Sequence, residues 1–408
     1  MNAPYRLLHE ISPAEFSRIR RRMIFEFCKW DPQVGDVAVL SNRPLLLAGN
    51  EWNLLTRHAE NLYCETLAAE AEIVQSPRLH QSLGLSRFIR NALAETCSDA
   101  TQHPPRLMRF DFHHTPLGWM ISEVNSDVPG GFIESSAFPS LVAEHFPGKT
   151  TLGDPARYLA QVIRANDAPF EAIAMVHATA YTDDRQVMVY LSRCFEAEGM
   201  RPMLASPADI RWELGAAYVR SRNREHRVDL MVRFFPSEWL PNLPRTCKPR
   251  RFFSNESPSI VNPASAIVTQ TKRFPLVWKD LKTKLSLWSK LLPETRVVDR
   301  ERMADESWIV KPALGRVGAL IGIHGVTPPQ ELAKIHATCK RHPAHWVAQK
   351  RFCITPVETL NGLEYPSIGV FVIDGRVAGC YGRISSRPII DDRAKDIVVL
   401  IETNNRDQ

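Results

Sequence analysis

The chain has 408 residues, about two to three times the usual domain length, which predicts two or three packed units. Its 44% hydrophobic and 24% charged residues are ordinary for a globular protein, and its 30 prolines argue against an all-helical bundle. The N-terminus has no apolar stretch after a basic one, and no window approaches 18 consecutive apolar residues. We therefore expect a cytoplasmic protein without a signal peptide or a membrane span.

The formal charge of +6 is a mild excess that is compatible with an anionic ligand such as a nucleotide. The densest basic run, residues 18–22, has no interleaved aromatic residues and is typical of a solvated helix face. The eight cysteines contain no CxxC pair, so the spacing predicts no zinc site.

The first hundred residues favour helices. Residues 12–30 begin with Ser12 as a plausible N-cap and Pro13 at the first helical position. Residues 50–75 carry apolar side chains at helical spacing, and two shorter helical stretches follow near 76–97. Residues 104–127 then alternate apolar and polar side chains on both sides of HHTPLG, which predicts a β-hairpin.

A strand–helix–strand order over residues 153–245 predicts a parallel sheet. The Pro-, Ser- and Asn-rich segment 241–265 is typical of a loop or domain boundary. The last third predicts a helix near 274–292, a strand–glycine turn–strand unit over 307–325, a helix over 328–341 and a strand over 345–352. Asp374-Gly375 between alternating runs predicts a second hairpin.

The first hairpin carries a set of polar residues that could bind a metal ion. Residues two apart on a strand share a face, so Arg109 lies beside Asp111, and Glu123 lies beside Asn125. Carboxylate and amide oxygens suit Mg²⁺, and a neighbouring arginine fits a phosphoryl oxygen. The alternative interpretation is ordinary ion pairing on a solvent-facing hairpin. The adjacent pair His113-His114 faces opposite sides of its strand and is not expected to bind a metal.

The second set is Lys311-Pro312-x-x-Gly315-Arg316-x-Gly318, a strand that ends in lysine and enters a glycine turn. The backbone N–H groups of such a turn could cover phosphates, although the pattern is neither a Walker A motif nor GxGxxG. A simple tight hairpin is the alternative. The third set is Gln349-Lys350 on a strand, together with Arg383 after GCYG.

Taken in order, these segments resemble the glutathionylspermidine synthase family of ATP-grasp ligases. The resemblance covers nearly the whole chain and is carried by residues 109–131, 231–240, 269–278, 309–322, 346–352 and 370–384. The R-x-D…E-x-N block and the KP-x-x-GR-x-G block are specific together, whereas each alone is a weak signal.

The resemblance implies an α/β (α+β) fold with an ATP-grasp core, circularly rearranged so that the metal-binding part lies N-terminal. Residues 1–152 would then form the N-terminal helices and the metal-binding part. Residues 153–262 would form a central pre-ATP-grasp α/β domain, and residues 263–408 the ATP-binding part with its lid.

The resemblance also implies roles for single residues. Asp111, Glu123 and Asn125 would bind Mg²⁺, and Arg109 would face the reacting phosphoryl group as the catalytic residue. The residues that would contact ATP are Lys272, Lys311, Gly315, Arg316, Gly318, Gln349, Lys350 and Arg383.

The implied activity is ATP-dependent carboxylate–amine ligation through an acyl phosphate, with ATP and Mg²⁺ as cofactors. The partners would be a small-molecule or peptide carboxylate and an amine, with no nucleic acid and no membrane. Gly130-Gly131 stands where the family carries hydroxyl residues that meet glutathione, and we expect no amidase domain before the synthetase part; we therefore expect other substrates. A catalytically inactive ATP-grasp nucleotide-binding protein is the alternative, followed by a basic nucleic-acid-binding protein.

Overall fold

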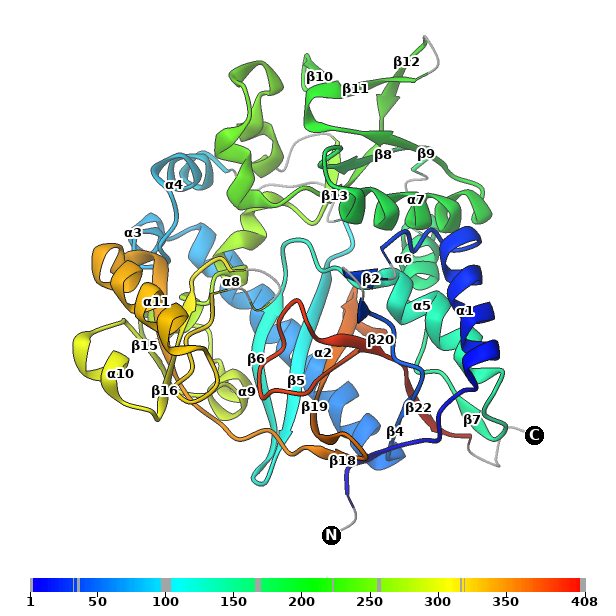
Figure 1. The fold of residues 1–408 in the computed structure, drawn as a ribbon. Coiled ribbons are helices and arrows are strands. Elements are labelled where there is room, and N and C mark those ends of the chain that lie inside the picture. Colours follow the sequence, from blue (N-terminus) through cyan, green and yellow to red (C-terminus); the bar gives the residue numbers. More distant parts are fainter. Residues whose placement is uncertain are drawn as a thin grey trace.

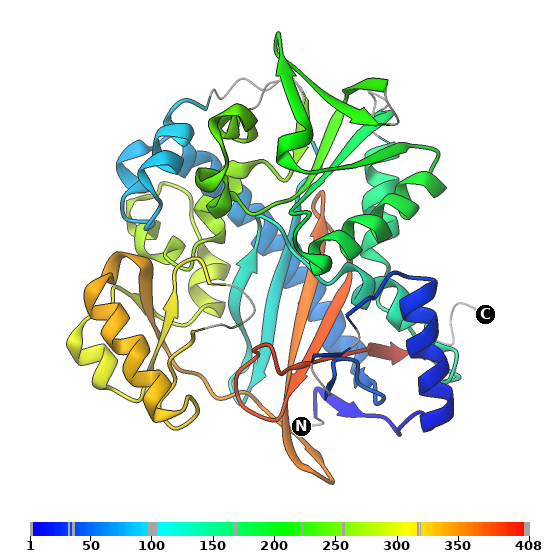
Figure 2. The ribbon, with the colours of Figure 1, turned by 45° about the horizontal axis from the view of Figure 1, so that its top comes forward.

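The fold is built around an antiparallel sheet that combines strands from both halves of the chain. The computed structural model describes residues 3–31, 33–34, 37–96, 104–165, 170–221, 224–254, 258–315, 318 and 320–403. Figures 1 and 2 show this central sheet with a second sheet beyond one end and a smaller part to one side. Its strands, in spatial order, are β21 (Lys395–Ile397), β20 (Arg376–Ser385), β19 (Gly362–Ile373), β5 (Leu107–Thr115) and β6 (Gly118–Asn125), with β18 (Val357–Thr359) paired to β19.

Both predicted hairpins are confirmed, and each supplies two neighbouring strands of the central sheet. β5 pairs with β6, and β19 pairs with β20 around Asp374 and Gly375, whose φ angles are 49° and 81°. Positive φ at both residues is what an Asp-Gly turn provides. The pairing of β19 with β5 joins the two hairpins and places Gly369 opposite Asp111.

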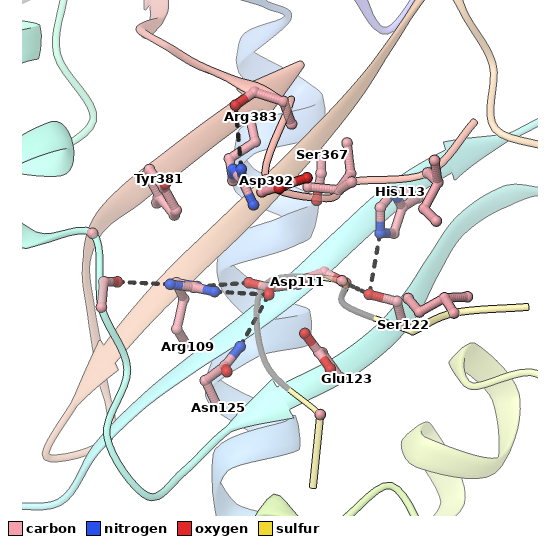
Figure 3. A pocket seen from close by; sticks show the side chains of 18 of the residues that line it. Arg109, Asp111, His113, Ser122, Glu123, Asn125, Ser367, Tyr381, Arg383 and Asp392 are labelled. Atoms are coloured by element: carbon pink, nitrogen blue, oxygen red, sulfur yellow. Dashed lines mark hydrogen bonds and ion pairs between the residues drawn. The ribbon is translucent and has the colours of Figure 1, made fainter. Parts of the chain in front are cut away.

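Helix α2 (Gly49–Val74) crosses the back of the central sheet, as Figures 1 and 3 show. It confirms the helix predicted over 50–75 and buries Leu55, Ala59 and Leu62 at helical spacing. Helix α1 (Pro13–Phe25) is also confirmed, and the Ser12 side chain accepts the N–H of Glu15 as its cap. Among the described helices, none is long and apolar enough to span a bilayer. The remaining N-terminal elements are β1 (Tyr5–Leu7), β2 (Gln33–Val34), β3 (Val37–Ala38), β4 (Leu45–Leu47), α3 (Pro77–His80) and α4 (Arg87–Ala94).

The parallel sheet predicted for the middle of the chain is confirmed. Its strand order is β14 (Ser259–Val261), β13 (Leu230–Phe234), β8 (Ala172–His177) and β9 (Arg201–Ala205). Helix α7 (Thr182–Ala197) connects β8 to β9 and packs on this sheet. An antiparallel extension follows, formed by β10 (Ile210–Glu213), β11 (Ala216–Ser221) and β12 (Arg224–Val228).

Helix α5 (Phe132–Ala143) and helix α6 (Pro155–Arg164) lie between the two sheets and contact β20 and α7. A further sheet joins the two ends of the chain, because β22 (Val399–Glu402) lies between β4 and β7 (Lys149–Thr150). The N-terminal and C-terminal thirds therefore share two sheets.

The smaller part contains β15 (Thr295–Arg296), β17 (Trp346–Lys350) and β16 (Trp308–Pro312), with α10 (Arg300–Ala304) and α11 (Pro329–Arg341) beside them. The preceding helices α8 (Ile267–Gln270) and α9 (Ser286–Leu291) contact α2 and β6. The predicted strand over 345–352 and helix over 328–341 are confirmed here. The continuous helix predicted near 274–292 is wrong, because a 3₁₀ turn over Phe274–Asp280 precedes α9. In the segment between these two elements, the backbone N–H groups of Lys282 and Thr283 donate hydrogen bonds to the Glu72 carboxylate, which holds that segment out of a helix.

The strand predicted after the glycine turn is also wrong for the described residues. Only an isolated bridge between Gly322 and Val310 follows β16 there. A Cβ at Gly322 would lie 2.6 Å from a methyl carbon of Val310, so the two backbones meet at this one close point.

A buried ion pair ties the central sheet to the parallel sheet. Asp127 follows β6, Arg233 lies on β13, and the side chains are 1% and 0% exposed. The Asp127 carboxylate also accepts the Ser237 N–H at 2.8 Å and the Ser237 hydroxyl at 2.7 Å. Arg233 donates to the Asn262 carbonyl at 3.0 Å. This network fixes the loop that follows the predicted metal-binding strand.

Candidate functional site

The β5–β6 hairpin brings the four predicted residues of the first set together on one face. Arg109 pairs in register with Asn125, and Asp111 pairs with Glu123. Figure 3 shows all four side chains on the same side of the sheet, with α2 behind it. The strand alternation argued from the sequence therefore puts two carboxylates, one amide and one guanidinium within reach of one ligand.

Arg109 and Asp111 form a two-point ion pair. Arg109 Nε donates to Asp111 Oδ1 at 2.7 Å, and Arg109 Nη2 donates to Asp111 Oδ2 at 2.9 Å. Asn125 Nδ2 donates to the same Asp111 Oδ2 at 3.0 Å, and Arg109 Nη1 donates to the Gly130 carbonyl at 2.6 Å. The guanidinium is thus held along its whole edge, and its charge balances a carboxylate that is a predicted metal ligand.

Two lysines from the C-terminal third complete the charged centre. Lys272 Nζ lies 2.7 Å from Glu123 Oε2 and donates to the Gly315 carbonyl at 2.9 Å. Lys311, at the end of β16, donates to Gln349 Oε1 at 2.8 Å and is only 6% exposed. The predicted lysines and the predicted metal ligands therefore form one cluster, although Glu123 and Lys272 are 149 positions apart in the sequence.

Burial and the mixed charges shift the titration of this cluster. Burial tends to raise the pKa of Glu123, but the ion pair with Lys272 and the nearby Lys311 lower it overall. Burial lowers the pKa of Lys311 to about 8, with Glu123 opposing the shift and Lys272 adding to it. With a pKa near 8, Lys311 is mostly protonated at neutral pH and faces Glu123 across the cavity lining.

These residues line a cavity of about 740 Å³, large enough for a nucleotide and a second small molecule. One group of lining residues, called the apolar end below, consists of Ile309 of β16, Ile321 and Ile323 beyond the glycine turn, and Phe352 and Ile354 after β17. A second group, called the acidic end below, includes Glu134, Asp183 and Asp396.

Gly315 and Gly318 of the predicted lid line this cavity, whereas Arg316 lies outside the described residues. Gly318 has φ of +63°, and a Cβ there would come 2.0 Å from the Ile390 carbonyl oxygen. The turn therefore packs backbone against backbone on the segment after β20, which only glycine permits at this position.

The third predicted set is divided by the structure. Arg383 lines the cavity and donates to the carbonyls of Asp391 at 2.7 Å and Ala394 at 3.2 Å. Gln349 does not line the cavity, and it contacts the charged cluster by accepting a hydrogen bond from Lys311. Lys350 does not line the cavity, because its ammonium donates to Ser307 Oγ at 2.8 Å and lies over the Trp308 ring.

Sequence reasoning missed the acidic end of the cavity. Lys29 from the segment after α1 is 5% exposed and lies 2.5 Å from Glu134, 3.1 Å from Asp31 and 3.8 Å from Asp396. Burial opposes the charge of Lys29, but these three carboxylates raise its pKa well above the usual value. Burial raises the pKa of Asp396 to about 6. These residues come from separate elements, so no local motif signalled the cluster.

His113 was also missed as a cavity residue. It lies two residues beyond Asp111 on β5, lines the cavity, and its Nε2 is 3.1 Å from Ser122 Oγ. His114 faces the other side of the strand and pairs with Thr355, as strand alternation predicts. Strand alternation was used to exclude a metal-binding histidine pair; applied once more, it would have placed His113 on the face of Asp111.

The donor set fits Mg²⁺ rather than zinc. Among the described residues, no three His, Cys, Asp or Glu side chains gather as a metal site. Two carboxylates and one amide match Mg²⁺, which is usually held by one or two carboxylates together with substrate phosphates and water. In this structure Arg109 pairs with Asp111 and Lys272 pairs with Glu123.

The mixed α/β fold with its several sheets is that of an ATP-grasp-related, glutathione synthetase-like protein. A family model described as glutathionylspermidine synthase preATP-grasp matches residues 39–402, and the chain belongs to that family. No match is found among the curated proteins. The family description points to the ligase class.

Similarity to a solved structure supports the fold. A glutathione synthetase-like effector from Globodera pallida aligns with a TM-score of 0.62 and 10% identity, over 96% of this chain and 98% of its own. A protein provisionally described as a gamma-glutamylcysteine synthetase from Methylobacillus flagellatus aligns with a TM-score of 0.45 and 13% identity, over 82% of this chain and 86% of its own.

Proposed function

We propose that this chain is an ATP-dependent carboxylate–amine ligase that forms an amide through an acyl phosphate. The observation that carries the proposal is the cluster of Asp111, Glu123, Asn125, Lys272 and Lys311 in one cavity, beside Arg109. Family membership supports the ligase class. The division of the chain at residues 152 and 262 remains a prediction.

The cavity supports a distinct place for each reactant. The adenine fits the apolar end, and the triphosphate fits beside Lys272 and Lys311. The reacting carboxylate then lies near Arg109, at the boundary with the acidic end. An ammonium-bearing substrate is electrostatically favoured at that acidic end, which includes Glu134 and Asp396.

The reaction needs positioning and charge neutralisation more than covalent help from the protein. The substrate carboxylate attacks the γ-phosphorus, ADP leaves, and the acyl phosphate forms; the neutral amine then attacks the acyl carbon and phosphate leaves. Bound Mg²⁺ supplies charge neutralisation at the phosphate oxygens. Lys311 and Lys272 hold the phosphates, Arg109 stabilises the transferring group, and the glycine turn at Gly315 and Gly318 excludes water.

The test is ADP release measured across a matrix of carboxylates and amines. Release that requires both an acid and an amine, with the amide identified by mass spectrometry, supports the ligase. Tight ATP binding without release for any pair supports the catalytically inactive alternative. The charged centre favours the ligase, because the predicted metal ligands and both lysines converge in one cavity.

The affinity for ATP should fall in alkaline solution. Lys311 is charged below its pKa of about 8 and loses its proton as the pH rises through that value, so its attraction for phosphate is lost. From pH 7 to pH 9 the dissociation constant for Mg-ATP should rise up to about tenfold by calorimetry. Lys311→Arg should remove this alkaline loss, because arginine stays charged. A loss of the same size in the variant would assign it to another group.

Glutathione with spermidine should be a poor substrate pair. Gly130 and Gly131 line the cavity next to Arg109 and offer no hydroxyl groups. Two missing hydrogen bonds of about 1 kcal/mol each correspond to roughly 30-fold in kcat/KM. We therefore expect other pairs in the matrix to exceed glutathione with spermidine by at least about tenfold. The prediction fails if that pair surpasses every alternative.

A further inference from the structure

The guanidinium of Arg109 has an aromatic partner on its face as well as polar partners along its edge. Its Cζ lies 5.0 Å from the centre of the Tyr381 ring and 6.0 Å from the centre of the Phe371 ring. Tyr381 is on β20 and its hydroxyl donates to Asp396 Oδ1 at 2.6 Å. Figure 3 shows Tyr381 on the same face of the sheet as Arg109, across β19 from it.

Two glycines make this contact possible. Gly369 of β19 pairs in register with Asp111 on one side and Tyr381 on the other. A Cβ at Gly369 would lie 2.8 Å from Arg109 Cδ and 2.7 Å from Asp111 Oδ1, so a side chain there would block the path of Arg109 across the strand. Glycine at this position lets a side chain from β5 reach a ring on β20.

The second glycine is Gly131, the N-cap residue of α5. Its φ is +93°, and a Cβ there would lie 2.9 Å from Tyr381 Cγ and Cδ1. The neighbouring Gly130 supplies the carbonyl that accepts from Arg109 Nη1. From the sequence we interpreted the Gly130-Gly131 pair as an absence of substrate-binding hydroxyl groups. In the structure, Gly131 also leaves space for Tyr381, and Gly130 anchors Arg109.

We propose that Tyr381 is a positioning residue for Arg109. The absence of a side chain at Gly131 and Gly369 allows the Tyr381 ring and the Arg109 guanidinium to meet. The inference rests on the proposed function, in which Arg109 faces the transferring phosphoryl group. Asp111 is a predicted metal ligand, so its oxygens are shared between a cation and Arg109. The Gly130 carbonyl and the Tyr381 ring are anchors that metal binding leaves in place.

The test compares variants that keep or remove the aromatic face in the full-length protein. Tyr381→Phe keeps the ring and removes only the hydroxyl, whereas Tyr381→Leu removes the ring. Tyr381→Leu should lower kcat for ADP release roughly 10- to 50-fold and leave the KM for ATP within about threefold. Tyr381→Phe should retain kcat within about threefold. Tyr218→Leu is a matched control, because Arg211 lies 4.6 Å above that ring in the antiparallel extension.

A second readout does not depend on turnover. In protein labelled with ¹⁵N-arginine, the Arg109 Nε–H resonance, assigned with Arg109→Lys, carries the ring-current shift of Tyr381. Tyr381→Phe should preserve that shift and Tyr381→Leu should abolish it, with Tyr381→Met as a replacement if the leucine variant does not fold.

The inference is overturned if Tyr381→Leu keeps kcat within twofold, or if Tyr381→Phe loses as much as Tyr381→Leu, since the ring would then not be the cause. Absence of both ATP binding and ADP release in the unmodified protein would instead refute the proposed function. The resonance would in that case still test the contact between Tyr381 and Arg109.

Discussion

Glu123→Gln is expected to lower amine-dependent ADP release by roughly 10³-fold while the protein stays folded. The substitution keeps the size of the side chain and removes one of the two predicted carboxylate ligands for Mg²⁺. It also leaves Lys272 without the ion pair that now holds it at 2.7 Å, so a cation in the phosphate site loses its orientation. Both effects act on charge neutralisation in the phosphoryl-transfer step.

The measurement is initial rate against Mg²⁺ concentration, with thermal unfolding as the check on folding. Glu358→Gln is the matched control, because Glu358 is an exposed carboxylate on β18 of the same sheet. We expect the control to keep its rate and Glu123→Gln to stay slow even at high Mg²⁺. A normal rate for Glu123→Gln at every Mg²⁺ concentration would remove Glu123 from the metal site.

The parts of the fold that the sequence predicted are those set by local chemistry. Ser12 and Pro13 mark the start of α1, and Asp374-Gly375 marks the β19–β20 turn, because caps and tight turns depend on a few adjacent residues. The pairing of β19 with β5 joins segments about 260 residues apart and has no local signal. The helix predicted near 274–292 failed for the same reason, since the distant Glu72 takes the N–H groups of the intervening loop.

For the candidate site, strand alternation was the most informative part of the sequence. It placed Arg109 with Asp111 and separated His113 from His114. The same rule, applied to Gln349 and Lys350, would have shown that adjacent residues of one strand cannot both face a ligand. The structure indeed directs Gln349 toward Lys311 and Lys350 toward Ser307.

The residues that sequence reasoning missed are joined only by tertiary packing. Lys29 enters the cavity from the segment after α1, while Glu134 comes from α5 and Asp396 from β21. Tyr381 is an aromatic residue in a largely buried strand, and from the sequence such a residue is ordinarily interpreted as part of the hydrophobic core. Its role emerges only when Gly131 and Gly369 are seen to leave space for it.

Asp127→Asn is expected to lower the free energy of unfolding by about 3–5 kcal/mol, because it leaves the buried charge of Arg233 without its counter-ion. The pair lies where the central sheet meets the parallel sheet, and neither side chain is more than 1% exposed. The Ser237 hydrogen bonds to the same carboxylate would also weaken. The measurement is urea unfolding at neutral pH.

Further variants separate the buried charge from other effects of the substitution. Glu225→Gln removes a partner of Arg211 on the surface, where the side chains are 46% and 47% exposed, and should leave the free energy of unfolding almost unchanged. The double variant Asp127→Asn/Arg233→Met removes both buried charges and should recover part of the loss. The single variant Arg233→Met completes the comparison. If the double variant loses as much stability as Asp127→Asn and Arg233→Met added together, the two charges do not interact. The attachment of the β6 loop to the parallel sheet would then depend on packing and on Asn262, whose side chain donates to the Ser126 carbonyl at 2.8 Å.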